Sequence, residues 1–102
     1  MRKLTFMNAF NKDMKKVSKY PQFDGKLLKE YCDNLVNGIA LPPKAKDHPL
    51  SKSSPSKYKG FRDFHLSPDI CVIYERTSDE ITLYRIGKHN NLGLTENLVD
   101  IL

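Results

Sequence analysis

The apolar positions near the start of the chain follow a helical period. Phe10, Met14 and Val17 recur at the i, i+4 and i+7 spacing of one helical face. Asn8 precedes this stripe and is a candidate N-cap, because its side chain can accept from the first free backbone N–H groups. The pattern therefore predicts an amphipathic helix that begins near residue 8.

A second apolar stripe, broader than the first, covers residues 27–36. Asp24 lies before it as a candidate N-cap, and Gly38 lies just past its end, where glycine commonly ends a helix. Pro21 separates the two stripes, because proline cannot continue a helix. We expect two helices that form an antiparallel hairpin.

Beyond Pro43 the apolar period becomes that of strands. Residues 58–66, 69–75 and 81–87 read as three strands with short polar turns between them, and residues 2–6 can form a short first strand. Short connections favour an antiparallel meander, with the helical hairpin packed on one of its faces. The sequence thus predicts an α+β fold, an N-terminal helical hairpin on a small antiparallel β-sheet. We expect residues 1–102 to form a single domain in which residues 95–102 are a C-terminal tail extension.

The period of two along each strand predicts which side chains share a face of this sheet. Asp63 and His65 share one face of their strand, whereas Arg85 is expected to share a face with Ile81 and Leu83. If the helices cover one face, the other face and the strand ends can gather several chemically active side chains: His48, His65, Asp69, Arg85 and His89. Imidazole has an ordinary pKa of ~6.5, so these histidines suit acid–base chemistry near neutral pH.

The charge and the cysteine content indicate the kind of partner and the cellular compartment of the protein. The formal net charge is +5 and the pI about 9.3, which favours a polyanionic partner. Cys32 and Cys71 are far apart and lie among apolar residues, so we expect buried free thiols in a reducing compartment. The first residues lack the apolar core of a signal peptide, and no apolar run approaches the ~20 residues that span a bilayer. We expect a cytoplasmic protein that does not contact a membrane.

Four motifs occur in a fixed order: Asp47-His48-Pro49-Leu50; Lys59-Gly60-Phe61-Arg62-Asp63-x-His65-x-x-Pro68-Asp69; Ile73-Tyr74; and Arg85-x-Gly87-x-His89. Their order and spacing resemble those of YafQ-type toxins of the RelE/ParE superfamily. The N-terminal Phe10-x-Lys12-Asp13-x-Lys15 also fits, so the resemblance covers most of residues 1–92.

The resemblance implies the toxin half of a type II toxin–antitoxin module, acting as a ribosome-dependent mRNA endoribonuclease. It implies a cognate antitoxin of the ribbon-helix-helix type, and contact with DNA only through that antitoxin. The expected partners are therefore the antitoxin, the ribosome and mRNA. The expected chemistry is metal-free RNA transesterification without a cofactor.

The matched positions carry expected roles. His89 is the candidate general acid, and either His48 or His65 is the candidate base. Arg85 would stabilise the charged phosphorane, and Asp69 would orient or tune a histidine. Asp63 is a supporting candidate for the same role as Asp69, and three basic residues are candidate RNA contacts: Lys59, Arg62 and Lys88.

The chain departs from the resembled pattern in its polar loop at residues 51–57 and at Gly93, where relatives commonly carry phenylalanine. Alternatives therefore stay open. One is a toxin of the ParE kind, which acts on gyrase without cleaving RNA, although that branch lacks the histidine set. A second is a zinc site built from three histidines and Asp69. A third is a degenerate toxin that retains antitoxin binding and operon repression. The apolar tail is expected to pack on the domain or against the antitoxin.

Overall fold

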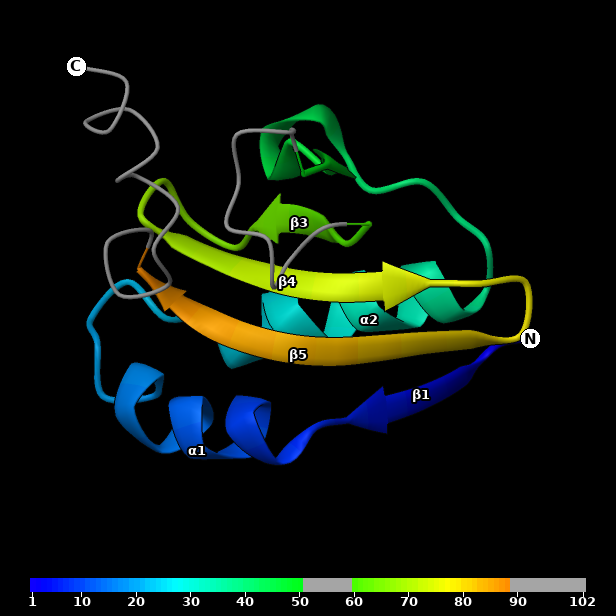
Figure 1. Ribbon diagram of the computed structural model, residues 1–102. Coiled ribbons are helices and arrows are strands. Elements are labelled where there is room, and N and C mark those ends of the chain that lie inside the picture. Colours follow the sequence, from blue (N-terminus) through cyan, green and yellow to red (C-terminus); the bar gives the residue numbers. More distant parts are fainter. Residues whose placement is uncertain (51–59, 89–102) are drawn as a thin grey trace, which may run out of the picture.

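A five-stranded sheet forms the centre of the structure, a computed structural model in which residues 1–50 and 60–88 are described (Figure 1). The elements are β1 (Lys3–Phe6), α1 (Asn8–Val17), α2 (Gly25–Val36), the 3-10 turn η1 (Pro43–Ala45), β2 (His48–Pro49), β3 (Arg62–His65), β4 (Ile70–Arg76) and β5 (Glu80–Lys88). The strand order is β1-β5-β4-β3-β2. The predicted α+β class is confirmed, with two helices and one sheet.

The sheet is mixed, because one edge strand pairs in parallel with an otherwise antiparallel sheet. β3, β4 and β5 form the predicted antiparallel meander. β1 adds a parallel edge, with Leu4 opposite Ile81 and Phe6 opposite Leu83. β2 adds a two-residue antiparallel edge that places His48 opposite Asp63. The sequence predicted neither the parallel pairing of the first strand nor the short β2, since both are defined by backbone hydrogen bonds rather than by an apolar period.

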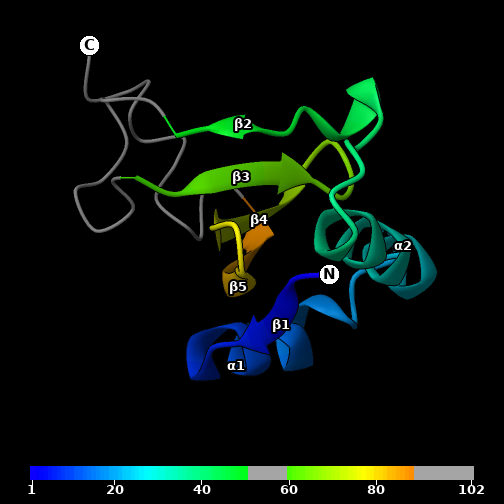
Figure 2. The ribbon, with the colours of Figure 1, turned by 90° about the vertical axis from the view of Figure 1, so that its right-hand side faces the viewer.

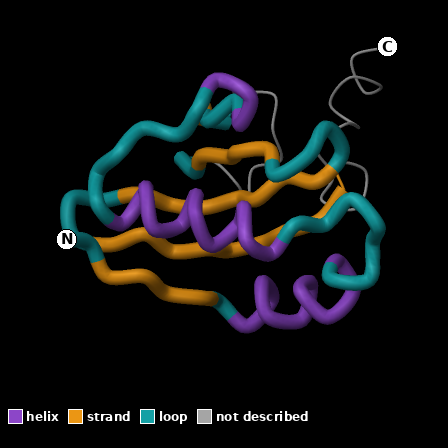
Figure 3. The backbone as a smooth tube through the Cα atoms, turned by 180° about the vertical axis from the view of Figure 1, so that it is seen from behind, coloured by secondary structure: helices purple, strands orange, loops and turns teal. Residues whose placement is uncertain are grey.

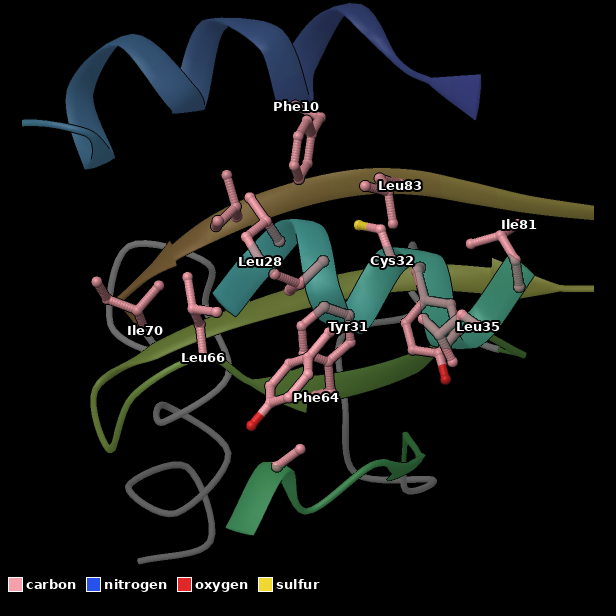
Figure 4. Packing of buried hydrophobic residues seen from close by; sticks show 14 of the residues in the cluster. Phe10, Leu28, Tyr31, Cys32, Leu35, Phe64, Leu66, Ile70, Ile81 and Leu83 are labelled. Atoms are coloured by element: carbon pink, nitrogen blue, oxygen red, sulfur yellow. The ribbon is translucent and has the colours of Figure 1, made fainter. Parts of the chain in front are cut away.

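One face of the sheet is covered by α2, as the side and rear views show (Figures 2 and 3). Tyr31 of α2 meets Phe64 of β3 edge-on, with ring centroids 5.6 Å apart. Leu28 and Cys32 of the same helix point into this core beside Leu83 of β5 (Figure 4). The apolar stripe of the second helix is therefore core, as its period predicted, and Cys32 and Cys71 are both buried free thiols.

α1 takes a different position from α2. It lies along the part of β5 that continues past the end of β1, at the edge of the sheet rather than over its face (Figures 1 and 3). Phe10 and Val17 of α1 are buried in this contact. The Asp13 carboxylate accepts a hydrogen bond of 3.1 Å from the backbone N–H of Ile86. α1 thus satisfies an edge donor that β1 is too short to reach.

The helix ends follow the predicted signals at α2 but not at α1. Asp24 accepts a 3.1 Å hydrogen bond from the backbone N–H of Leu27, and Gly38 follows the helix with φ +73°. Asn8 was expected to cap α1, yet it is the first helical residue, and Met7 occupies the capping position without a side-chain hydrogen bond. The tail at residues 95–102 and the polar loop at 51–57 lie outside the described residues. Within the described residues, neither helix has the length and apolar character needed to cross a membrane.

Two matched substitutions test this difference in capping. Asp24→Ala should lower the free energy of unfolding by about 1 kcal/mol, because the N–H of Leu27 loses its acceptor. That loss corresponds to a fall in melting temperature of roughly 4–8 °C for a domain of this size. Asn8→Ala should leave the melting temperature close to that of the parent. Equal losses in the two variants, measured by circular dichroism melts, would contradict the assignment.

Candidate active site

A row of side chains crosses the sheet on its open face, which is the face opposite α2. This face carries the small buried cluster of Cys71 and Ile73 as well as the half-exposed His48. The strand registers place His48 opposite Asp63, Asp63 opposite Ile73, and Ile73 opposite Arg85. Neighbouring strands lie ~4.8 Å apart, so the backbones of His48 and Arg85 are about 14 Å apart across β2, β3, β4 and β5. Two predicted site residues thus stand at the ends of one row, with Asp63 inside it.

Asp63 is the buried charge of this row. Its exposed fraction is only 2%, and within the described residues its Oδ1 atom has no hydrogen-bond partner. The same Oδ1 lies 3.3 Å from Nδ1 of His48. Burial raises the pKa of the Asp63 carboxyl above its ordinary value, and the nearby His48 and His65 oppose that rise. The carboxylate therefore gains from any positive charge that forms on these imidazoles.

His48 is held in one tautomer by the chain that leads into β2. Its Nδ1 is hydrogen-bonded to the backbone carbonyl of Lys46. A carbonyl can only accept, so Nδ1 carries the hydrogen, and Asp63 lies on the same side of the ring. Neutral His48 consequently has its lone pair on Nε2, and half of its side chain is exposed. This is the arrangement of a base that can reach a bound substrate.

His65 occupies the next row along β3, two residues beyond Asp63 and opposite Cys71. The predicted shared face of Asp63 and His65 is confirmed, because both oppose residues of the small second cluster formed by Cys71 and Ile73. His65 also borders a pocket of about 380 Å³. Lys44 and Lys46 line the same pocket, and sequence reasoning missed them, since lysines in a connector carry no distinguishing period.

Arg85 lies on a different face from the one predicted. A β-bulge between β4 and β5 pairs Ile73 with Arg85 but Tyr74 with Leu83, so Tyr84 is the extra residue. Ile81 and Leu83 stay in the core, whereas Arg85 moves to the open face opposite Ile73. The expectation that these three share a face is wrong, because a period of two does not survive a bulge.

The guanidinium of Arg85 is fixed by α1. Its Nε and Nη2 donate to the two oxygens of Asp13, at 2.6 and 3.0 Å. This bidentate geometry orients the guanidinium and offsets much of its charge. Asp13 is a further residue that sequence reasoning left without a role, although it belongs to the motif Phe10-x-Lys12-Asp13.

Asp69 and Lys88 lie together at one end of the sheet. Asp69 accepts a 2.8 Å hydrogen bond from Gln22, which lowers the pKa of its carboxyl, and the charge of Lys88 acts in the same direction. The Lys88 ammonium lies 4.6 Å from the centre of the Tyr20 ring. This is the end at which the chain leaves β5 towards His89. Asp69 thus lies near Lys88, the residue that precedes His89 in the sequence, rather than in the His48–Asp63 row.

Arg62, another candidate RNA contact, is separated from this face. Arg62 is opposite Tyr74, a core residue on the covered side, and its Nε donates to Asp47 and to the Tyr74 hydroxyl at 3.3 and 3.2 Å. Lys59 and His89 lie outside the described residues. Among the residues that are described, no three His, Cys, Asp or Glu side chains form a group that could hold a metal ion.

This α+β domain belongs to a class of bacterial toxins, those of type II toxin–antitoxin systems. The sequence model of the YafQ toxins of these systems matches residues 2–94. The chain belongs to the YafQ family.

Known relatives match this chain along nearly their whole length. The mRNA interferase toxin YafQ of Escherichia coli strain B/BL21-DE3 is 36% identical over 89 residues, which is 86% of this chain and 91% of the relative. The solved complex of E. coli DinJ with YafQ matches with a TM-score of 0.76 at 35% identity, covering 90% of this chain and 98% of that one. A metal-bound toxin from Helicobacter pylori matches with a TM-score of 0.77 at 36% identity, covering 90% and 99%.

The raised pKa of Asp63 predicts a pH-dependent stability difference. Asp63→Asn removes a carboxylate whose ionised form is penalised by burial, so the variant should gain stability relative to the parent as pH rises. The gain should begin above the ordinary carboxyl pKa of ~3.9, grow until the raised pKa of the folded state is passed, and then level off. Denaturant unfolding from pH 3 to 8 measures it. A parent that is increasingly favoured over the variant with rising pH would show that the histidines outweigh burial.

Proposed function

We propose that this chain is an mRNA interferase that cleaves translated mRNA by metal-free transesterification, with His48 as the base. The YafQ family membership and the mRNA interferase relatives support the enzyme class. The observation that carries the mechanism is the fixed tautomer of His48. Its Nδ1–H faces a carbonyl and the buried Asp63, which leaves Nε2 to take a proton.

In the proposed reaction, Nε2 of His48 removes the proton from a ribose 2′-hydroxyl. The 2′-oxygen attacks the adjacent phosphorus, the bond from phosphorus to the 5′-oxygen breaks, and His89 protonates the departing oxygen. The products are a 2′,3′-cyclic phosphate and a 5′-hydroxyl. Asp63 stabilises the imidazolium that forms on His48, because its carboxylate is buried beside that ring.

The other site residues position the phosphate and the acid. Arg85 offers a guanidinium held by Asp13, aimed from the opposite end of the row, and it contacts the phosphorane oxygens. Asp69 and Lys88 set the electrostatics where the chain approaches His89. His65 lies beside Asp63 on the same face and contacts the RNA backbone with Lys44 and Lys46.

The proposed partners follow from the family and the charge. A cognate antitoxin of the ribbon-helix-helix type holds the toxin inactive, as DinJ is bound to YafQ in the E. coli complex. The ribosome presents the mRNA, and the net charge of +5 favours association with its RNA. Toxin and target then meet in the cytoplasm.

Histidine substitutions test the catalytic assignment. His48→Ala and His89→Ala should each slow cleavage on translating ribosomes by ~10²–10⁴-fold, because each removes one proton-transfer group. His48→Asn keeps a donor for the Lys46 carbonyl but has no basic nitrogen, so it should be as inactive as His48→Ala. Antitoxin binding should persist in all three, and thermal melts should show that they are folded. If folded variants of His48, His65 and His89 all arrest growth fully, the protein is a toxin that acts by binding alone.

The metal question has its own test, since the H. pylori relative was solved with bound metal. We expect the purified toxin to hold less than stoichiometric zinc or copper. Toxin treated with chelator and desalted before addition to ribosomes should keep its full cleavage rate. One equivalent of metal, lost together with activity and restored with it, would overturn the metal-free mechanism.

A further inference from the structure

A hollow of about 490 Å³ opens beside the histidine–aspartate row and has no role in the reaction described above. Its walls are mainly apolar, with Phe6 and Met7 on one side and Phe61 and Tyr84 on the other, and Arg85 borders it. Phe6 and Met7 are 47% and 39% exposed, so two neighbouring large apolar side chains are accessible at this hollow. The volume lies within the ~300–1,000 Å³ range of ligand sites.

The aromatic wall of this hollow is fixed in place. The rings of Phe61 and Tyr84 are stacked, with centroids 4.4 Å apart and planes 20° apart. The Tyr84 hydroxyl donates to Glu75 at 3.2 Å, which restrains the ring from its far end. Tyr84 is the extra residue of the β-bulge, so Tyr84 and Arg85, although consecutive, lie on the same face. A rigid aromatic pair of this kind loses little entropy when a planar ligand binds.

The hollow is continuous with the proposed catalytic row. Phe61 precedes Asp63 by two residues, about 7 Å along the strand direction, and Arg85 belongs to both the hollow and the row. A ligand held by the aromatic pair would therefore have its neighbouring group beside the Arg85 guanidinium. Single-stranded RNA has this alternation of flat apolar bases and anionic phosphates, and its bases stack on aromatic side chains.

We propose that this hollow binds the nucleobase of a nucleotide next to the scissile phosphate, with Tyr84 and Phe61 as the stacking platform. The inference rests on the proposed ribonuclease function and adds a base-binding subsite to it. Tyr84 and Phe61 are positioning residues, because they act on the substrate away from the reacting atoms. Their loss should weaken substrate binding and alter which bases flank the cleavage site, while the proton-transfer groups remain intact.

Steady-state cleavage of translated mRNA tests this subsite. Tyr84→Ala should raise KM by about 5- to 150-fold, the range expected for one lost base–aromatic stack, with a smaller effect on kcat. Phe61→Leu should raise KM in the same direction, because leucine keeps apolar volume but not the ring face. Tyr84→Phe should recover most of the affinity lost in Tyr84→Ala. Ile39→Ala, at an exposed apolar position outside the hollow, is the matched control and should match the parent.

The outcomes separate this inference from the function on which it rests. A parent toxin that leaves mRNA intact defeats the proposed function itself. A parent that cleaves, with folded Tyr84→Ala and Phe61→Leu variants of unchanged KM and unchanged flanking-base preference, defeats the subsite alone. Unchanged KM with weaker binding of the cognate antitoxin by calorimetry would assign the hollow to the antitoxin and likewise overturn the proposal. If Tyr84→Ala does not fold, Phe61→Leu decides.

Discussion

The burial of the Asp63 carboxylate is the constraint on which the open face of the sheet depends. An unpaired carboxylate inside a small domain is costly, and Oδ1 of Asp63 has no hydrogen-bond donor among the described residues. What compensates is the proximity of two imidazoles, one across the β2–β3 pairing and one further along β3. A two-residue strand such as β2 contributes little to stability, yet it places His48 against Asp63. The main consequence of the pairing is therefore the position of His48, the proposed base, against Asp63.

Two features of β5 build the other half of the site. The bulge brings Tyr84 and Arg85 together on the open face, and α1 lies along the strand where β1 has ended. Asp13 joins these features, because one carboxylate accepts both from the Arg85 guanidinium and from the backbone N–H of Ile86. The edge of the sheet, α1 and the Arg85 guanidinium are thus held together by a single side chain. The surface that results has a charged row and an apolar aromatic hollow side by side, which suits a polymer of phosphates and bases.

The hydrophobic periodicity of the sequence, together with its helix-capping and helix-ending residues, predicted most of this fold. The position of α2 between Asp24 and Gly38, and the meander of β3, β4 and β5, follow directly from apolar spacing and from residues with special backbone preferences. The shared face of Asp63 and His65 follows from strand alternation. The parallel pairing of β1 and the short β2 could not be predicted, because they depend on backbone hydrogen bonds between segments distant in sequence.

The sequence supplied candidate site residues, which stay predictions, but it did not supply their geometry. Strand alternation placed Arg85 on the wrong face, since nothing in the letters around Tyr84 marks a bulge. The pairing of Arg85 with Asp13 joins residues 72 positions apart, and only the packing of α1 on β5 creates it. The resemblance supplied His48 and His89, whereas the tautomer of His48 required the position of the Lys46 carbonyl.

The most direct test of this account is the chemistry of the ends left on cleaved mRNA. Attack by the ribose 2′-oxygen must leave a 2′,3′-cyclic phosphate on one fragment and a 5′-hydroxyl on the other. We predict these ends from the purified toxin acting on translating ribosomes, and no cleavage where the nucleotide before the scissile bond lacks its 2′-hydroxyl. Fragments with a 5′-phosphate and a 3′-hydroxyl, or cleavage that persists at the deoxynucleotide, would contradict the role assigned to His48 and Asp63.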